Sequence, residues 1–189
     1  AASDVYKRQI WEQAAAKLGE WKKAGINMSI SVNISPKDFY YIDIFNTFAG
    51  LIKKYDIEPS NLKIEITETT IMSDVPNLMG ELEELRKAGF TLEMDDFGSG
   101  YSSLNTLKDI NVDVLKVDMG FIKETKNVKK SRIILASVIK MAKELNLLII
   151  TEGVETEEQV DNLTKLGCDV FQGYYFSKAI DAVSYTHLR

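Results

Sequence analysis

Histidine and cysteine are almost absent from this 189-residue sequence, which holds one of each, His187 and Cys168. A zinc site built from His and Cys ligands is therefore excluded, and so is a disulfide framework within the chain. Such sparing use of cysteine is typical of a reducing compartment, so we expect a cytoplasmic domain. Any membrane-bound sensor joined to it would lie outside this chain.

Long apolar runs and an excess of basic charge are also lacking. The longest segment without a charge, residues 24–36, has 13 residues, whereas a membrane-spanning helix needs about 20 apolar ones. Lys+Arg 23 against Asp+Glu 28 gives a net charge of −5, which leaves no broad basic surface for duplex nucleic acid. A polyanionic ligand would need metal ions or a local cationic pocket. With 45% apolar and 27% charged residues, the chain is expected to be globular, and a disordered or collagenous chain is excluded.

Segments typical of strands and helices alternate from about residue 10 onward. Apolar runs and alternating hydrophobicity predict six strands, over residues 28–34, 62–66, 90–94, 114–117, 147–150 and 170–171. Alternation of strands and helices along a chain predicts a parallel sheet covered by helices.

Three of the intervening helices have clear sequence signals. Pro76 is expected in the first turn of one helix, which Gly89 should end. Thr156 and Gln159 have the spacing of a capping box at the start of another. The third is predicted by an apolar stripe with spacings of four, three and four residues, made of Ile134, Val138, Met141 and Leu145.

Polar side chains at the strand ends distinguish two possible architectures. Each predicted strand has one such residue at or just beyond its end, namely Asn33, Glu65, Asp95, Lys116, Glu152 and Gln172. An open, doubly wound sheet gathers its ligands at one switch point, served mainly by two loops. Six functional strand ends suit a closed barrel instead, where all of them meet at one face. We therefore expect an α/β fold, an incomplete (β/α)8 TIM-type barrel with about six βα units, since a complete barrel takes roughly 250 residues.

The two ends of the chain differ from the rest. Residues 1–9 and 183–189 do not continue the neighbouring pattern and resemble translated adapter or vector sequence. We expect a partial domain over residues 10–182 with non-native ends.

The acidic residues at the strand ends predict a divalent metal site. Asp95 and Asp96 are adjacent at a strand end and would repel each other strongly if buried without cations. Oxygen ligands alone favour Mg²⁺ or Mn²⁺, as one ion or as a pair that activates water and holds a phosphoryl group. The other oxygen donors are Asn33, Glu65, Glu68, Glu152 and Glu155. Taken singly, each acid also fits a solvated loop residue or a helix N-cap, an alternative that stays open above all for Glu68, Asp118 and Glu155.

Lys116 and Gln172 are candidates for contacts with an anionic ligand. Lys116 lies inside an apolar strand, where a lysine is costly to bury unless acids or a phosphate pair with it. It could contact a phosphate or activate the attacking water, or it could extend outward to solvent between helices. A Schiff base is disfavoured, because the surrounding acids would keep the amine protonated. Gln172 could hydrogen-bond a base or ribose, or satisfy backbone groups in the interior.

Six ordered segments together resemble the EAL domain, a family of bacterial cyclic-di-GMP phosphodiesterases with a modified (β/α)8 barrel. The segments are SVNIS at 31–35, EITET at 65–69, DDFGSGYSSL at 95–104, LKVD at 115–118, EGVET at 152–156 and QGY at 172–174. The resemblance extends from about residue 10 to residue 180. It implies that the parent protein hydrolyses one phosphodiester bond of cyclic-di-GMP, giving linear pGpG.

The resemblance also implies a metal-ligand set. Asn33, Glu65 and Asp95 match metal ligands of the family, with Asp95 bridging two ions of Mg²⁺ or Mn²⁺. Asp96 then serves the second ion, and Glu152 supports that ion and the hydrolytic water.

Further roles follow from the same resemblance. Lys116 is similar to the lysine that orients or deprotonates the water, and Gln172 to the glutamine at the substrate end of the site. Glu68 resembles the residue that steadies the loop over residues 97–103, which couples metal binding to dimerisation in the family. A homodimer is therefore compatible with the resemblance. The loop positions concerned are Gly98, Gly100 and Ser102.

The sequence departs from the family in one important respect. The Glu-Ala-Leu triplet that names the family, whose glutamate is a metal ligand, does not occur in the chain. The 189 residues alone are therefore expected to be inactive. Two alternatives stay open at this point: a non-catalytic receptor for cyclic-di-GMP or for a protein partner, and an unrelated barrel enzyme acting on a phosphorylated metabolite.

Overall fold

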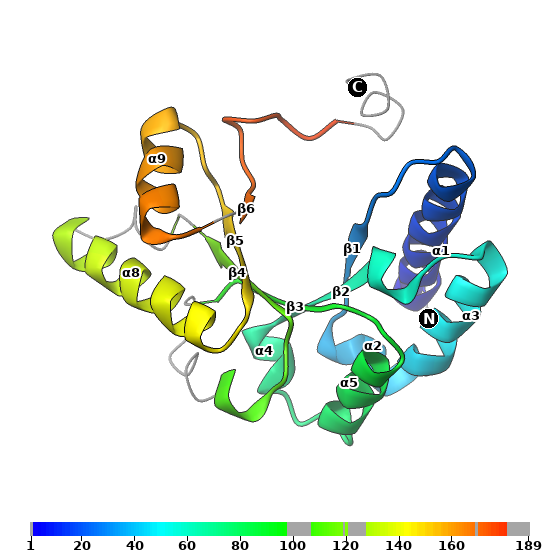
Figure 1. The fold of residues 1–189 in the computed structure, drawn as a ribbon. Coiled ribbons are helices and arrows are strands. Elements are labelled where there is room, and N and C mark those ends of the chain that lie inside the picture. Colours follow the sequence, from blue (N-terminus) through cyan, green and yellow to red (C-terminus); the bar gives the residue numbers. More distant parts are fainter. Residues whose placement is uncertain (1, 98–106, 119, 121–127, 169, 181–189) are drawn as a thin grey trace. The chain divides into compact units, whose positions relative to one another are not determined.

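The computed structural model describes residues 2–97, 107–118, 120, 128–168 and 170–180 of the chain (Figure 1). The chain forms two compact units, residues 1–114 and residues 115–189. The elements of the first unit are α1 (Ala2–Lys23), β1 (Ile30–Asn33), α2 (Pro36–Tyr41), α3 (Ile44–Tyr55), the 3-10 helix η1 (Pro59–Asn61), β2 (Leu62–Thr67), α4 (Glu68–Ile71), α5 (Leu78–Lys87) and β3 (Leu92–Asp95). Those of the second are β4 (Val114–Asp118), which begins at the boundary, α8 (Val128–Glu144), β5 (Leu148–Glu152), α9 (Glu157–Leu166) and β6 (Val170–Phe171).

All six predicted strands are present, with ends shifted by at most two residues. In the first unit β1 pairs in parallel with β2, and β2 with β3. In the second unit β5 pairs in parallel with β6. The predicted alternation of strand and helix along the chain is thus confirmed for the described residues.

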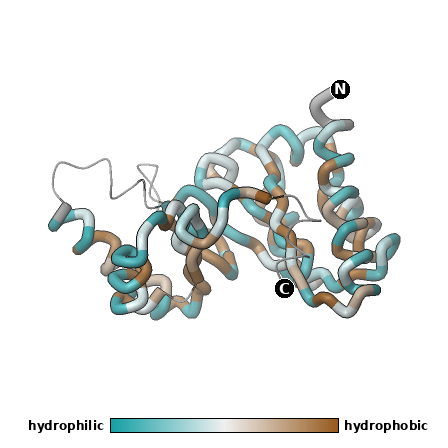
Figure 2. Tube along the Cα trace, turned by 90° about the horizontal axis from the view of Figure 1, so that it is seen from above, coloured by the Kyte–Doolittle hydropathy of each residue, from teal (hydrophilic) through white to brown (hydrophobic). Residues whose placement is uncertain are grey.

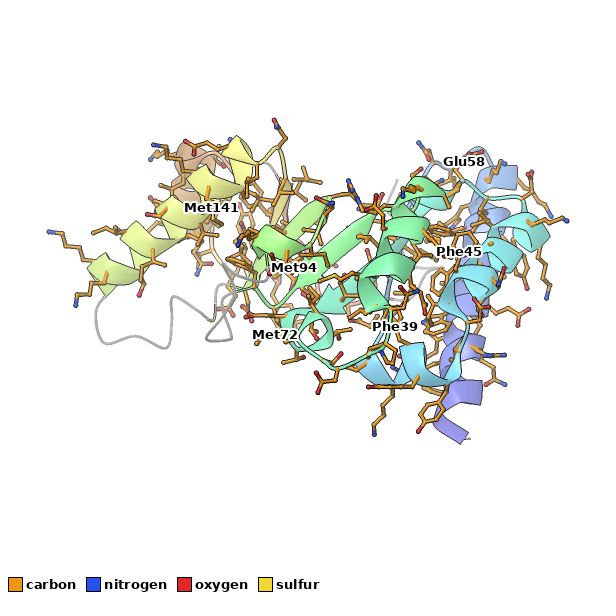
Figure 3. The ribbon with its side chains drawn as sticks, turned by 90° about the horizontal axis from the view of Figure 1, so that it is seen from below. Phe39, Phe45, Glu58, Met72, Met94 and Met141 are labelled. Atoms are coloured by element: carbon orange, nitrogen blue, oxygen red, sulfur yellow. The ribbon has the colours of Figure 1, made fainter. Side chains whose placement is uncertain are left out.

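The core of the first unit lies between one face of the β1–β3 strands and the helices beside them. The buried side chains of that face include Val32, Ile64, Ile66, Leu92 and Met94, the last of which Figure 3 labels. Aromatic rings continue this core: Phe48 of α3 lies 5.2 Å from Trp11 of α1 and 5.9 Å from Phe90, between ring centroids. Hydrophilic and hydrophobic residues alternate along the helices (Figure 2), as amphipathic helices require.

Asp113 anchors the beginning of β3. Its Oδ1 accepts hydrogen bonds from the Arg86 guanidinium, with Nη2 at 2.9 Å, and its Oδ2 accepts one from the Leu92 N–H at 2.9 Å. The hydrogen bond to Asp113 raises the pKa of Arg86 above its usual range. Since β3 ends at the predicted metal ligand Asp95 and is followed directly by Asp96, Asp113 fixes the strand that leads to both.

Helix α5, which precedes β3, starts later than predicted. Pro76 precedes α5, whose N-cap is Asn77 in the left-handed conformation (φ 57°). The chain therefore turns between Pro76 and the first helical residue, Leu78. The predicted end of the helix is confirmed, because Gly89 follows it with φ 94°. The buried face of α5 is apolar and consists of Leu78, Leu82 and Leu85.

The predicted apolar stripe of α8 is wrong by one residue. Ile134 and Leu145 are 47% and 53% exposed, whereas the buried apolar residues of this helix are Leu135, Ile139 and Ala142. The helix has apolar residues both at the predicted positions and one residue further along the chain, so two apolar stripes have nearly the same spacing. Periodicity alone could not show which of the two stripes is buried.

The capping box of α9 is confirmed. Thr156 Oγ1 accepts from the Gln159 N–H at 3.3 Å, and Gln159 Oε1 accepts from the Thr156 N–H at 3.0 Å. Gly167 ends the helix with φ 97°. This cap fixes where α9 begins, with four residues between it and the end of β5.

Helix α1 includes residues 2–9, which the sequence analysis set apart. Lys7 Nζ lies 2.5 Å from Asp38 Oδ2 and 2.9 Å from Ser35 Oγ. The foreign origin of residues 1–9 and 183–189 stays a prediction.

Among the described helices, none is both long enough and apolar enough to cross a membrane.

Candidate active site

The polar residues of strands β1, β2 and β3 all lie on one face of these strands. Successive residues of a strand point to opposite faces, so alternate residues share a face. The face opposite the apolar core carries Ser31 and Asn33 from β1, Lys63, Glu65 and Thr67 from β2, and Glu93 and Asp95 from β3.

Strand register brings three predicted metal ligands close together on this face. The Cα atoms of Asn33 and Glu65 are direct partners in the β1–β2 pairing. Asp95 is paired with Thr67, so it stands one pleat beyond Glu65 on the next strand. Since neighbouring strands lie about 4.8 Å apart, three oxygen donors from three adjacent strands share a small area at the carboxyl ends.

The chain bends sharply directly after Asp95. Asp96 adopts the left-handed conformation (φ 56°), which Asp tolerates better than most residues, and its N–H donates to Asp95 Oδ1 at 3.0 Å. The bend therefore orients the Asp95 carboxylate and places Asp96 in an exposed position at the strand end. The loop residues Gly98, Gly100 and Ser102 lie outside the described residues.

Glu68 begins α4 and is 2% exposed. Thr67 caps this short helix by accepting from the Thr70 N–H at 3.3 Å. The Thr67 hydroxyl also lies 2.8 Å from that of Thr69 and 3.0 Å from that of Thr70. These contacts fix the turn that follows the end of β2. The proposed role of Glu68 in steadying the loop at 97–103 stays a prediction.

Lys116 and Glu152 form an ion pair in the second unit. Lys116 of β4 is 6% exposed, and its Nζ lies 2.8 Å from Oε1 of Glu152, the last residue of β5. The ammonium is therefore held by a carboxylate and does not extend outward to solvent. Ion pairing keeps a buried lysine charged and fixes its direction.

Backbone hydrogen bonds hold Gln172 beside the end of β5. The Gln172 N–H donates to the Thr151 carbonyl at 2.8 Å, and the Val154 N–H donates to the Gln172 carbonyl at 3.1 Å. The next residue, Gly173, approaches the Val154 backbone so closely that an added Cβ would lie 2.1 Å from the Val154 carbonyl oxygen. Glu152 and the exposed Gln172 thus stand at neighbouring strand ends.

Substituting Ala for Gly173 is expected to destabilise the protein by about 3 kcal/mol, because the backbone would have to separate β6 from the β5 end. Urea unfolding followed by circular dichroism measures the change. Gly50→Ala is the matched control: a Cβ at Gly50 meets nothing within 4 Å, and alanine favours a helix interior by about 0.5–1 kcal/mol. A Gly173→Ala protein as stable as the original would contradict the importance of this close approach.

The donor chemistry of the first unit fits a hard divalent cation. Asn33, Glu65 and Asp95 offer amide and carboxylate oxygens, the ligands that Mg²⁺ and Mn²⁺ prefer. In the part of the chain that the structure describes, however, no group of three or more His, Cys, Asp or Glu side chains forms a ready metal site. The fit therefore rests on donor type and strand register, with Asn33 as a necessary member of the set.

Sequence reasoning missed three residues of the same face. Ser31 Oγ donates to Glu93 Oε2 at 2.7 Å, and Lys63 Nζ lies 2.9 Å from Glu93 Oε1. Glu93 is 1% exposed, and the Lys63 side chain is 21% exposed. The available signal was a charged residue inside an apolar strand, the same signal that drew attention to Lys116.

Comparison with known proteins places these observations in a family. The sequence profile of the EAL domain matches residues 3–179. The protein belongs to the EAL domain family.

Several curated relatives are named as cyclic di-GMP phosphodiesterases. The bifunctional diguanylate cyclase/cyclic di-GMP phosphodiesterase MucR of Pseudomonas aeruginosa is 34% identical over 174 residues, 92% of this chain and 25% of MucR. The cyclic di-GMP phosphodiesterase RocR of the same species is 32% identical over 170 residues, 90% of this chain and 43% of RocR. This chain spans about a quarter of the length of MucR and a similar share, 21%, of the signalling protein YkoW of Bacillus subtilis.

Solved structures confirm the predicted fold class. The MucR phosphodiesterase in complex with c-di-GMP has a TM-score of 0.85 at 34% identity, covering 94% of this chain and 72% of that chain. The EAL domain of Mycobacterium smegmatis DcpA has a TM-score of 0.87 at 31% identity, covering 96% and 82%. BlrP1 of Klebsiella pneumoniae, in a complex with manganese and cyclic-di-GMP, has a TM-score of 0.81 at 29% identity, covering 94% and 46%. The chain therefore has the α/β fold of these barrel domains, with six of the strands.

Proposed function

We propose that this domain serves a metal-dependent phosphodiesterase that hydrolyses cyclic-di-GMP to linear pGpG. Family membership and relatives named as cyclic-di-GMP phosphodiesterases support the proposal. The observation that carries it is the placement of Asn33, Glu65 and Asp95 on one face of three adjacent strands.

The proposed metal centre uses oxygen donors from the strand ends. Asn33, Glu65, Asp95 and Asp96 of the first unit would hold Mg²⁺ or Mn²⁺, and the family resemblance assigns Glu152 of the second unit to the support of a second ion. Bound divalent ions supply a water of lowered pKa and offset the charge of the phosphodiester. The Asp96 N–H donates to Asp95 Oδ1 at 3.0 Å and so fixes the direction of the Asp95 carboxylate at the strand end, which supports this assignment.

The proposed water and substrate contacts come from the second unit. Lys116 would orient the attacking water as a charged donor, and its ion pair with Glu152 supports a fixed position for that work. Gln172 would hydrogen-bond the guanine or ribose end of the substrate. The attack of water on phosphorus breaks one P–O ester bond and leaves pGpG as the product.

The setting of the enzyme is also part of the proposal. The single Cys168 favours a reducing, cytoplasmic setting. We take Mg²⁺ or Mn²⁺ as the natural ion because the donors are all oxygens, and a homodimer as the assembly because loop 97–103 couples metal and partner in the family resemblance.

The test compares the 189-residue chain with a completed domain, in which a segment bearing Glu-Ala-Leu from the MucR domain precedes it. With Mn²⁺, the completed domain is expected to convert cyclic-di-GMP to pGpG, detected by chromatography, and the 189-residue chain to show little turnover. EDTA should abolish the reaction in the completed domain. Tight binding of cyclic-di-GMP without any pGpG would overturn the enzymatic proposal in favour of a receptor.

A further inference from the structure

Beneath the three proposed metal ligands of the first unit lies a second layer of polar side chains. Ser31, Lys63 and Glu93 each stand two residues before a proposed ligand on the same strand: before Asn33, Glu65 and Asp95 respectively. Because residues i and i+2 share a face of a strand, the two layers lie one above the other. We call Ser31, Lys63 and Glu93 the under-layer.

Glu93 joins the under-layer across three strands. Its two carboxylate oxygens are both engaged, one by Lys63 Nζ of β2 at 2.9 Å and the other by Ser31 Oγ of β1 at 2.7 Å. The Ser31 contact reaches past the intervening strand β2, a span of about 9.6 Å between strand axes in a flat sheet. The Glu93 side chain therefore lies across β2, on the face that carries Glu65.

The under-layer places two opposite charges close to the ligand layer. The Cα of Glu93 is the direct partner of that of Glu65, and Lys63 precedes Glu65 by two residues. At 1% exposure the Glu93 carboxylate is almost completely shielded from solvent, so salt screens its field far less than that of a surface charge. A charge in this position changes the attraction of the ligand layer for a cation.

We propose that the Lys63–Glu93 pair tunes the affinity of the neighbouring site for its divalent cation. Glu93 adds negative charge that favours the cation, Lys63 offsets it, and Ser31 holds the second carboxylate oxygen in place. These are positioning residues that act through Glu65 and Asp95, not ligands. The inference rests on the proposed function, because it takes the metal site of Asn33, Glu65 and Asp95 as given.

A double-mutant cycle on the 189-residue chain tests the proposal through Mn²⁺ binding, followed by electron paramagnetic resonance of the free ion. Glu93→Gln keeps the shape and both hydrogen-bond partners but removes the negative charge, so Mn²⁺ affinity should fall about tenfold. Lys63→Met removes the positive charge, so the affinity should rise by a similar factor. The double variant Lys63→Met/Glu93→Gln should return close to the original affinity.

Thermal unfolding with and without Mn²⁺ separates charge tuning from a merely structural role. Lys63→Met leaves the buried Glu93 carboxylate without its cation, so the metal-free Tm should fall, and the double variant should recover it. The rise in Tm on adding Mn²⁺ should be larger for Lys63→Met and smaller for Glu93→Gln than for the original chain. A purely structural pair would shift the metal-free Tm and leave this rise unchanged.

The exposed pair of Lys54 on α3 and Glu12 on α1 is the matched control. Lys54→Met and Glu12→Gln should leave Mn²⁺ affinity unchanged. Equal Mn²⁺ affinity in all four members of the Lys63–Glu93 cycle would overturn the inference while leaving the proposed function intact. Absence of Mn²⁺ binding both in the 189-residue chain and in the completed domain would overturn the metal site itself, and with it both proposals.

Discussion

Replacing Asp95 with Asn is expected to abolish Mn²⁺-dependent hydrolysis of cyclic-di-GMP, with at least a hundredfold loss of kcat/KM in the completed domain. The amide keeps the size of the side chain and can still accept the Asp96 N–H, which now lies 3.0 Å from Asp95 Oδ1. It loses the negative charge that the proposed metal site takes from this side chain. The loss should therefore appear in metal binding and turnover, with little change in Tm.

The control for Asp95→Asn is Asp74→Asn, since Asp74 is exposed and offers only its backbone carbonyl to Tyr40 at 2.7 Å. It should retain full activity and full Mn²⁺ affinity. Both variants should unfold at the temperature of the original protein, by circular dichroism without metal. Retained turnover in Asp95→Asn would refute the assignment of Asp95 as a metal ligand.

The second large effect is expected at Lys116. Lys116→Met should lower kcat about a hundredfold and change KM by less than threefold, because a residue that prepares the attacking water acts mainly on the chemical step. The pair with Glu152 at 2.8 Å, in a position 6% exposed, fixes the ammonium for this role. Steady-state kinetics of the completed domain, over a range of cyclic-di-GMP concentrations, measures both constants.

Loss of the Lys116 cation also leaves Glu152 without its partner, so the kinetic loss must be separated from unfolding. Circular dichroism spectra and Tm of Lys116→Met provide that separation, and Lys140→Met provides the matched control because Lys140 is 79% exposed on α8. A rise in KM with kcat unchanged would make Lys116 a substrate-binding residue only.

Local sequence patterns fixed much of the secondary structure because their physical causes are local. The alternation in β1 and the apolar runs of the other strands predicted all six strands to within two residues. The Thr156–Gln159 capping box depends on groups three residues apart, so it needs no distant partner. Residues at strand ends were likewise found from the sequence, since the end of a strand is itself a local feature.

The failures have a different origin. On α8 the residues Ile134 and Leu135 are both apolar, and only the neighbouring elements decide that Leu135 is buried and Ile134 exposed. At α5, the left-handed Asn77 moves the helix start beyond Pro76. Neither outcome can be calculated from spacing, because each depends on where the next element packs.

The sequence by itself determined the family, the order of strands and helices, and the residue types that can hold an oxygen-ligated cation. Tertiary structure alone decided which of these residues are neighbours: the pairing of Asn33 with Glu65, and the reach of Glu93 across β2 to Ser31. Parallel strands are joined through helices, so residues about thirty positions apart become adjacent only when the sheet register is set. Register is a property of whole strands, which is why the Lys63–Glu93 pair is visible only in the folded chain.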